Sequence, residues 1–151
     1  MTAGAELGAR LLRTRWVVRA PIALFRAGLG FVFGSRMLML QHIGRRSGAA
    51  RFVVLEVVDR PAPQEIVIVS GFGKQAQWYR NIVADPHVRV WIGTRRGAPA
   101  IATAMSEPES AAALAHYARI HPVAWDRLRA TIEQATAAPV ETLPMVRLTL
   151  A

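Results

Sequence analysis

Short apolar stretches alternate with interruptions rich in Gly, Pro and charged residues from residue 37 onward. Stretches of this length that are rich in Val, Ile and Leu and bounded by turn-forming residues are typical of buried strands. Strands are therefore expected at residues 37–43, 51–58, 65–70, 88–92, 98–104 and 143–150. The intervening turns and loops are expected at residues 44–48, 59–63, 71–75 and 93–97.

Helical periodicity, with start and stop signals, accounts for most of the remaining apolar positions. Ser106 with Glu109 three residues later forms a capping box that opens a helix through Ile120. The residue before a proline avoids the helical region, so Asp85-Pro86 ends a shorter helix. Helices are expected at residues 5–34, as a pair broken near Ala20-Pro21, and at 77–84, 106–120 and 123–137. The order and spacing favour an α+β fold, a small antiparallel barrel flanked by helices, in one domain.

The composition limits the classes of protein to which the chain can belong. The 151 residues are 52% hydrophobic, which is typical of a single folded domain. The absence of cysteine excludes disulfides, thiolate nucleophiles and zinc–thiolate sites, and it is compatible with the reducing cytoplasm, where we expect the protein. The formal net charge is +9, and Lys74 is the only lysine, so arginine carries the excess. Arginine favours anionic partners, although a GC-rich genome would enrich it too.

The N-terminal segment, residues 1–35, is expected to be helical and amphipathic. Arginines interrupt its apolar sequence, so neither a secretory signal nor a membrane span is expected. At helical spacing Arg15, Arg19 and Arg26 fall on one stripe, which resembles the basic face of an interfacial helix. Peripheral contact of residues 10–34 with an anionic membrane is therefore one expectation. Packing on the protein's own barrel, or on a second subunit in a homodimer, is the alternative.

Gly44-Arg45-Arg46-Ser47-Gly48 lies between two predicted strands and is the strongest candidate for a binding site. Its two glycines allow a tight reversal of the chain, and its two arginines and serine gather charged and neutral donors. Arginine binds phosphate and carboxylate groups with two parallel hydrogen bonds, so the loop suits a phosphate or a polycarboxylate. A strand-to-strand turn with a solvated basic tip is the alternative.

The sequence shows no familiar constellation of catalytic side chains. The acidic residues have no spacing that marks acid–base chemistry. None of the four histidines has the helical spacing of a metal site, and we expect no metal ligands. No serine lies in a nucleophile elbow, and no phosphate loop of the Walker type is present. If the protein is an enzyme, a bound organic cofactor therefore supplies the chemistry.

A second glycine-rich segment, Ser70-Gly71-Phe72-Gly73-Lys74, follows a predicted buried strand and leads into Trp78 and Tyr79. Its glycines let the backbone approach a planar ligand, and Lys74 adds a point charge. The Ser70 hydroxyl could donate to a developing oxyanion, or it could cap its own loop. Trp78 and Tyr79 could form a wall of a ring-binding site, although periodicity favours an inward position for Trp78.

Three segments follow one another in a distinctive order. They are Gly44-Arg45-Arg46-Ser47-Gly48, Val67-Ile68-Val69-Ser70-Gly71-Phe72-Gly73 and Trp78-Tyr79-Arg80-Asn81-Ile82-Val83-Ala84-Asp85-Pro86-His87-Val88. In this order they resemble the deazaflavin-dependent nitroreductase family, over roughly residues 36–105. The resemblance implies a split β-barrel over residues 36–151, similar to the flavin-binding barrels of the pyridoxamine-phosphate-oxidase type.

The resemblance also implies a cofactor, coenzyme F-420, whose deazaflavin delivers hydride and whose tail ends in phosphate and oligoglutamate. It implies that Arg45, Arg46 and Ser47 match the loop for the tail phosphate, and that Ser70–Lys74 line the deazaflavin. The candidate cofactor-binding residues in the matching segments are Arg45, Arg46, Ser47, Gly48, Ser70, Gly71, Phe72, Gly73, Lys74, Trp78 and Asn81.

The function that we expect is reduction of a quinone-like or other electron-poor small molecule by reduced coenzyme F-420. Ser70 is the first catalytic candidate, and Tyr117 and His121 are the next, for proton supply or for shaping the substrate pocket. The alternatives are a barrel that binds flavin mononucleotide (FMN) or haem, and a basic protein that binds nucleic acid or a membrane surface without catalysis. Nucleic acid is disfavoured, because the aromatic residues are not interleaved with basic ones on strands.

Overall fold

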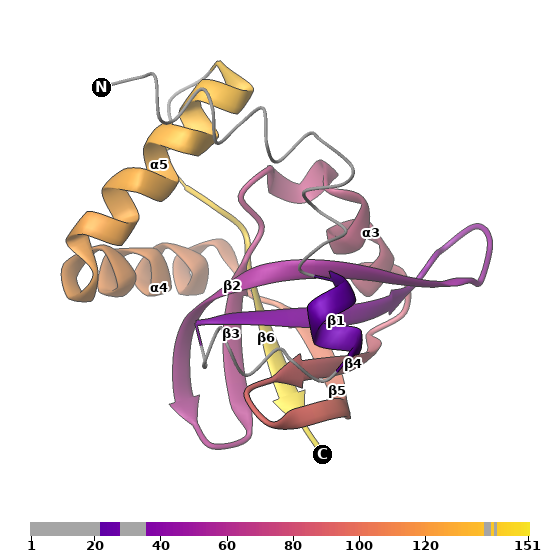
Figure 1. Cartoon of the computed structure of the whole chain (residues 1–151). Coiled ribbons are helices and arrows are strands. Elements are labelled where there is room, and N and C mark those ends of the chain that lie inside the picture. Colours follow the sequence, from indigo (N-terminus) through magenta and orange to yellow (C-terminus); the bar gives the residue numbers. More distant parts are fainter. Residues whose placement is uncertain (1–21, 28–35, 138–139, 141) are drawn as a thin grey trace.

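The computed structural model of the protein describes residues 22–27, 36–137, 140 and 142–151. Six antiparallel strands close into a barrel in the order β1-β2-β3-β6-β5-β4 (Figure 1). The strands are β1 (Met37–Ile43), β2 (Ala50–Ala62), β3 (Glu65–Val69), β4 (His87–Ile92), β5 (Arg95–Ala104) and β6 (Met145–Leu150). The helices are α3 (Gln77–Ala84), α4 (Glu107–Ile120) and α5 (Pro122–Thr136), and η2 (Gly73–Gln75) is a 3-10 turn. The predicted α+β fold with an antiparallel barrel is confirmed.

The barrel interior is filled by side chains at alternate strand positions, because successive strand residues point to opposite faces. In β1, Leu38 and Leu40 point inward and are fully buried. Helix α3 packs against the same cluster through Trp78, Tyr79 and Ile82. The neighbouring polar residue of α3, Asn81, is buried as well. The barrel thus fixes α3 in place and brings a polar group of that helix next to β1.

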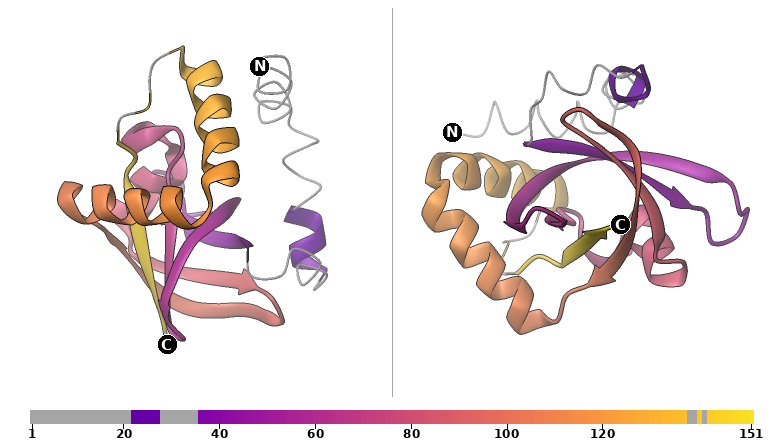
Figure 2. Two further views of the ribbon diagram at one scale, coloured as in Figure 1. Left: turned by 90° about the vertical axis from the view of Figure 1, so that its left-hand side faces the viewer. Right: turned by 90° about the horizontal axis from the view of Figure 1, so that it is seen from below.

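Helices α4 and α5 cover part of the outer surface of the barrel and form an L in two views (Figure 2). They enclose a second apolar cluster against the outer faces of β2, β3 and β6. Leu114 and Tyr117 of α4 and Ile132 of α5 lie in this cluster. The predicted capping box opens α4: the Ser106 hydroxyl accepts from the Glu109 N–H, and the Glu109 carboxylate accepts from the Ser106 N–H.

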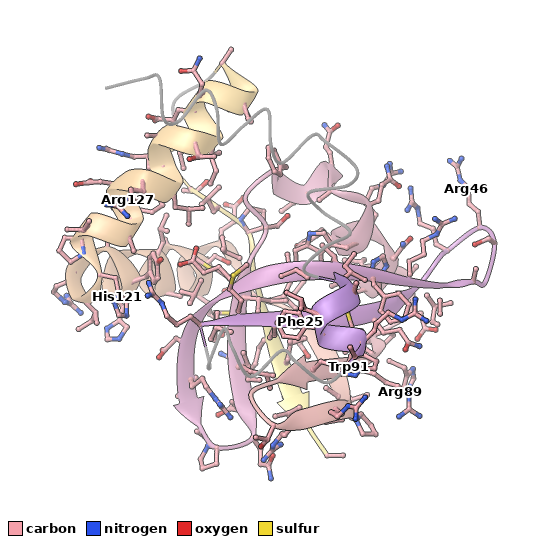
Figure 3. The ribbon with its side chains drawn as sticks, in the orientation of Figure 1. Phe25, Arg46, Arg89, Trp91, His121 and Arg127 are labelled. Atoms are coloured by element: carbon pink, nitrogen blue, oxygen red, sulfur yellow. The ribbon has the colours of Figure 1, made fainter. Side chains whose placement is uncertain are left out.

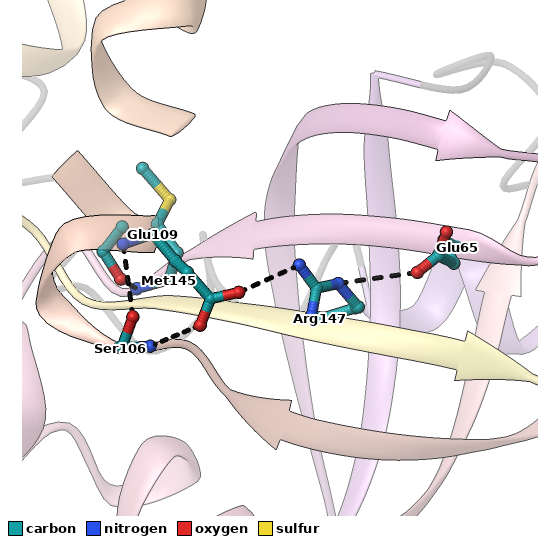
Figure 4. A network of polar contacts seen from close by, with 6 residues as sticks. Glu65, Ser106, Glu109, Met145 and Arg147 are labelled. Carbon is teal, nitrogen blue, oxygen red and sulfur yellow. Dashed lines mark hydrogen bonds and ion pairs between the residues drawn. The ribbon is translucent and has the colours of Figure 1, made fainter. Parts of the chain in front are cut away.

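An arginine joins this capping box to the barrel (Figure 4). Arg147 on β6 lies 3.4 Å from the Glu109 carboxylate and 3.5 Å from that of Glu65 on β3. The Glu109 carboxylate therefore contacts both the Ser106 N–H and Arg147. Hydrogen bonds from Ser106 and the contact with Arg147 lower the pKa of Glu109. These contacts have a structural role, since they fix the start of α4 on the sheet.

Residues 22–27 lie against the outside of the barrel, and residues 22–26 are helical. Phe25 is buried, and the Arg26 guanidinium lies 5.0 Å from the centre of the Phe52 ring. Arg96 donates to the Arg26 carbonyl at 3.3 Å. For this short stretch, packing on the protein's own barrel is the arrangement that the structure shows. The remaining residues of the predicted helices at 5–34, and most of the 1–35 segment, lie outside the described residues.

Two loops are shorter in the structure than predicted, so these two predictions are wrong in length. Strand β2 continues through the expected turn at 59–63 as far as Ala62, because bulges in its pairing with β3 absorb Pro61, which has no N–H for the ladder. Strand β5 starts at Arg95, so the expected loop at 93–97 shrinks to Gly93 and Thr94. Gly93 has a φ of 56°, in the left-handed region that a tight hairpin turn requires. The other predicted strands and helices agree with the structure within two residues at each end, outside the N-terminal segment.

Candidate functional site

The loop between β1 and β2 closes through short local hydrogen bonds. The Gly44 N–H donates to the Ala49 carbonyl at 2.9 Å, and the Gly48 N–H donates to the Gly44 carbonyl at 2.8 Å. Gly48 has a φ of 70°, which explains a glycine at this position. Ser47 accepts from the Ala49 N–H at 3.2 Å. The loop projects from the barrel and carries Arg46 outward (Figure 3).

A polar cavity of about 280 Å³ lies beside this loop, which we call the arginine cavity. It is lined by Gly44, Arg45, Arg46, Ser47, Arg51, Gln77 and Asn81. Desolvation, followed by repulsion from Arg80 and Arg46, lowers the pKa of Arg45. Within the described part of the chain, no carboxylate forms an ion pair with any of these arginines. Guanidinium groups that surround a cavity and have no carboxylate partner are suited to an anionic ligand.

Asn81 holds Arg45 from the side of α3. Its Oδ1 accepts from the Arg45 backbone N–H at 3.1 Å and from Arg45 Nη1 at 2.8 Å. Its Nδ2 lies 3.0 Å from Nδ1 of His42, a residue of β1 that is 4% exposed. Burial, with a smaller contribution from Arg51, lowers the pKa of His42 to about 4, so the imidazole is neutral at pH 7. A neutral ring can accept the Asn81 proton at Nδ1.

The structure brings four of the predicted cofactor-binding residues together around the arginine cavity: Arg45, Arg46, Ser47 and Asn81. Gly48 shapes the loop without lining the cavity. The sequence analysis missed Arg51 and His42, which face each other across the β1–β2 pair. A signal for Arg51 was present, because it begins the strand that follows the arginine loop. No local signal marked His42, whose role depends on a helix far along the chain.

The second glycine loop lies outside the arginine cavity. The Ser70 hydroxyl is buried and donates to the Gly73 carbonyl at 2.6 Å, which is the loop-capping alternative. Gly71 packs against Ile132 of α5, where an added Cβ would lie 3.2 Å from the Ile132 side chain. Phe72 is 49% exposed, and Gly73 has a φ of 82°. The loop is therefore a folded turn on the protein surface.

Two further residues predicted to contact the cofactor are also placed away from the arginine cavity. Lys74 lines a small cavity of about 60 Å³ with residues of α4 and of the segment before β6. Trp78 is buried in the barrel cluster, edge-on to Tyr79 with ring centres 5.9 Å apart, as periodicity favoured. The structure thus separates the two glycine-rich segments that the sequence analysis assigned to one ligand. Their common ligand stays a prediction.

A second polar cavity, of about 310 Å³, lies between the outer face of β2 and the start of α5, and we call it the tyrosine cavity. Tyr117 and His121 both line it, with ring centres 5.4 Å apart. The Tyr117 hydroxyl donates to the Glu56 carboxylate at 2.5 Å. Burial, followed by the contact with Glu56, raises the pKa of Tyr117 above its ordinary value. The cavity is further lined by Arg36, Val57, Val58, Asp59, Arg60 and Ala124.

Arg46 and His121 lie on opposite sides of the molecule, so the two polar cavities are well separated (Figure 3). A further cavity, of about 530 Å³, lies elsewhere, on the outer face of β1, β4, β5 and β6. Its lining is mostly apolar. In the described residues, no group of three or more His, Asp or Glu side chains is placed to hold a metal ion. No described helix is long and apolar enough to cross a membrane.

Comparison with known proteins decides the family. The sequence profile of the F420H(2)-dependent quinone reductase family matches residues 19–142, which is most of the chain. The chain belongs to this family. The family that the sequence resemblance implied is confirmed, and reduced coenzyme F-420 is the cofactor that the family name states.

Individual relatives agree with this assignment. A Mycobacterium tuberculosis protein named as a candidate F420H(2)-dependent quinone reductase is 37% identical over 75 residues, which cover 47% of this chain and 60% of that relative. A solved structure of an F420-H2 dependent reductase (FDR-A) superposes with a TM-score of 0.52 at 19% identity, over 75% of this chain and 93% of the other. An FMN-binding protein from Nostoc punctiforme, related to pyridoxamine 5'-phosphate oxidase, superposes with a TM-score of 0.53 at 13% identity, over 87% and 79%. At these identities the structures show the fold, a split β-barrel, as predicted.

Proposed function

We propose that the protein uses reduced coenzyme F-420 to reduce a quinone-like or other electron-poor small molecule. The observation that carries the proposal is the arginine cavity, where the guanidinium groups of Arg45, Arg46 and Arg51 have no ion-pair partner among the described residues of this family member. The coenzyme has an anionic tail, and the cavity offers the donors for one. FMN also carries a phosphate, so it is the ligand against which the proposal is tested.

The residues of the arginine cavity fit an anionic tail. Arg45 and Arg51 present guanidinium groups that can bind phosphate or carboxylate oxygens with two parallel hydrogen bonds. Arg46 adds a third charge at the tip of the loop, and Ser47 adds a hydroxyl. Arg45 keeps its position because Asn81 accepts from its backbone and from its side chain. These residues would hold the tail before the substrate arrives.

For Tyr117 and His121 to act on the substrate, the deazaflavin of a coenzyme held in the arginine cavity must extend to the tyrosine cavity on the other side of the molecule, because hydride passes only between atoms in direct contact. Conversion of a quinone to a hydroquinone needs a hydride, which the bound reduced coenzyme supplies, and a proton at the substrate oxygen. His121 is exposed at the end of α4 and lines the cavity, and it remains the proposed candidate for proton supply. Tyr117 holds its proton firmly against Glu56, so its proposed role is to orient the substrate. Ser70 would act through the shape of the Gly71–Gly73 turn, because its hydroxyl donates to Gly73.

Other parts of the functional prediction are untested by the structure. A homodimer, peripheral contact of residues 10–34 with an anionic membrane, and a cytoplasmic location stay predictions. Haem in place of the deazaflavin also stays an untested alternative, because guanidinium groups can bind its carboxylates as well. The division of this single domain into an N-terminal helical segment, 1–35, and a split-barrel part, 36–151, also stays a prediction.

The test is anaerobic oxidation of reduced coenzyme F-420 by benzoquinone, followed by absorbance in single turnover. The parent protein is expected to accelerate the reaction, and the Arg45→Ala, Arg46→Ala double variant is expected to need at least ten-fold more coenzyme for the same rate. Arg127→Ala, on the exposed face of α5, is the matched control and should behave as the parent. No acceleration over the protein-free reaction, with coenzyme bound, would contradict the proposed activity.

A further inference from the structure

His42 is a buried titratable residue that the proposed mechanism leaves without a role. It lies on β1 behind the arginine loop and does not line the arginine cavity. Its Nδ1 atom contacts the side-chain amide of Asn81, 3.0 Å away and 39 positions later in the chain. Asn81 is itself 2% exposed, so neither side chain can exchange this partner for bulk water.

The chemistry of Asn81 makes its orientation important. An asparagine side chain has one accepting oxygen and one donating nitrogen of nearly equal size, and it can turn over. Two donors of Arg45, the backbone N–H and Nη1, converge on one atom of this amide. That atom must be the oxygen. The reversed amide would set an NH2 group against both Arg45 donors and would release the loop.

A neutral imidazole has one accepting and one donating nitrogen, and only the accepting nitrogen suits the Asn81 NH2 group. With Nδ1 unprotonated and the proton on Nε2, His42 accepts from Asn81 and excludes the reversed amide. Burial and the positive charge of Arg51, which lies opposite His42, both favour the neutral ring, because they disfavour a second proton on it. Arg45, held by Asn81, adds positive charge nearby.

We infer that His42 is a positioning residue for the arginine cavity: its Nδ1 atom fixes the Asn81 amide, and the amide fixes Arg45. This inference rests on the proposed binding of an anionic tail in the cavity, and it deepens that proposal. The chain of contacts runs from β1 to α3 and then to the loop, so a buried histidine that touches no ligand sets the affinity for one.

The first test needs no coenzyme. In the free protein, nitrogen NMR of the His42 ring is expected to show an unprotonated Nδ1 and a protonated Nε2. Hydrogen exchange is expected to show a protected Arg45 amide. In His42→Leu the Arg45 amide should lose at least ten-fold of its protection, while the Gly48 amide, which donates to Gly44, stays protected and shows that the loop is folded. A protonated Nδ1 in the parent, or an unchanged Arg45 amide in His42→Leu, would overturn the inference.

The second test uses coenzyme F-420 as the probe, in a fluorescence titration. His42→Leu should bind it at least ten-fold more weakly than the parent, and His42→Asn, whose Oδ1 can replace Nδ1 as acceptor, should restore affinity to within about three-fold. In an Asn81→Ala background, His42→Leu should have no further effect, because both changes remove the same contact. Equal affinity of His42→Leu and the parent would overturn the inference, as would full additivity of the two changes. Lack of coenzyme binding by the parent would refute the proposed function, and the NMR and exchange results would still decide the role of His42.

Discussion

The Tyr117 hydroxyl of α4 donates to the Glu56 carboxylate of β2 at 2.5 Å and thereby attaches the outer helices to the barrel at the edge of the tyrosine cavity. The two residues are 61 positions apart in the chain. Tyr117 is buried in the cluster between α4, α5 and the sheet, so the contact lies where packing already holds both partners. It gives the tyrosine cavity a fixed wall.

Tyr117→Phe keeps the ring and removes the hydroxyl. Because a hydrogen bond to a charged group contributes about 1.5–3 kcal/mol, we expect the free energy of unfolding to fall by about that amount. The measurement is urea denaturation at pH 7. His116→Ala, on the exposed side of the same helix, should change stability by less than about 0.5 kcal/mol. A Tyr117→Phe protein as stable as the parent would show that the contact does not hold α4.

The stability of the protein is expected to fall in mild acid because of His42. Its pKa is about 4 in the folded protein and about 6.5 in the unfolded chain, so the unfolded chain binds more protons between these values. The contribution of neutral His42 is therefore complete above pH 6.5 and is lost as the pH falls toward 4, by up to about 3 kcal/mol.

The measurement for His42 is the free energy of unfolding of the parent and of His42→Asn between pH 7.5 and pH 4. Asparagine does not titrate, so the parent should lose more stability than the variant over this range. The difference between the two proteins should be flat above about pH 6.5. Parallel curves over the whole range would show that His42 is protonated equally in the folded and unfolded states.

Gly44→Ala tests the shape of the arginine cavity. An added Cβ would lie 2.7 Å from Ser47 Oγ and 3.0 Å from Arg51 Nε, which are the ends of side chains that can move aside. We expect coenzyme F-420 to bind about ten-fold more weakly, and the melting temperature to change by only a few degrees. Calorimetric titration measures the first and thermal unfolding the second. Unchanged affinity would show that Ser47 and Arg51 do not contact the ligand.

Contact with membranes is a prediction for residues 10–34. Each basic residue near an anionic surface contributes about 1 kcal/mol, so Arg15, Arg19 and Arg26 together would give weak binding that salt reverses. Co-sedimentation with anionic vesicles at low ionic strength should therefore exceed that with neutral vesicles. Arg26 already lies over Phe52 on the barrel, so Arg26→Ala is expected to reduce sedimentation less than Arg19→Ala. Equal recovery in the supernatant with both kinds of vesicle would favour packing on protein.

Most of the fold could be predicted from the sequence because its signals are local. The apolar runs of β1 and β3, the capping box of Ser106, and the proline after Asp85 each act within a few residues. The lengths of β2 and β5 could not be predicted in the same way. Pro61 and Gly97 are turn signals, and only pairing with neighbouring strands shows that irregularities in the ladder accommodate them.

The candidate site was predictable only in part, for a related reason. Arg45, Arg46 and Ser47 are neighbours in sequence, so the sequence alone predicts that this loop gathers donors for an anion. The contact between His42 and Asn81 depends on closure of the barrel, which brings β1 against α3. The separation of Ser70–Lys74 from the arginine loop depends on the same closure. Contacts between residues that are far apart in the chain depend on the tertiary structure, and they cannot be predicted from spacing in the sequence.

The central claim is that the arginine cavity binds the anionic tail of a deazaflavin coenzyme. Its most direct test is parallel titration of coenzyme F-420 and FMN into the purified protein and into the Arg45→Ala, Arg46→Ala double variant, followed by fluorescence. The account predicts tighter binding of coenzyme F-420 than of FMN, and a loss of at least ten-fold in the variant, since each charge-assisted contact contributes about 1.5–3 kcal/mol. Tighter binding of FMN by the parent, or equal affinity of the parent and the variant for coenzyme F-420, would contradict it.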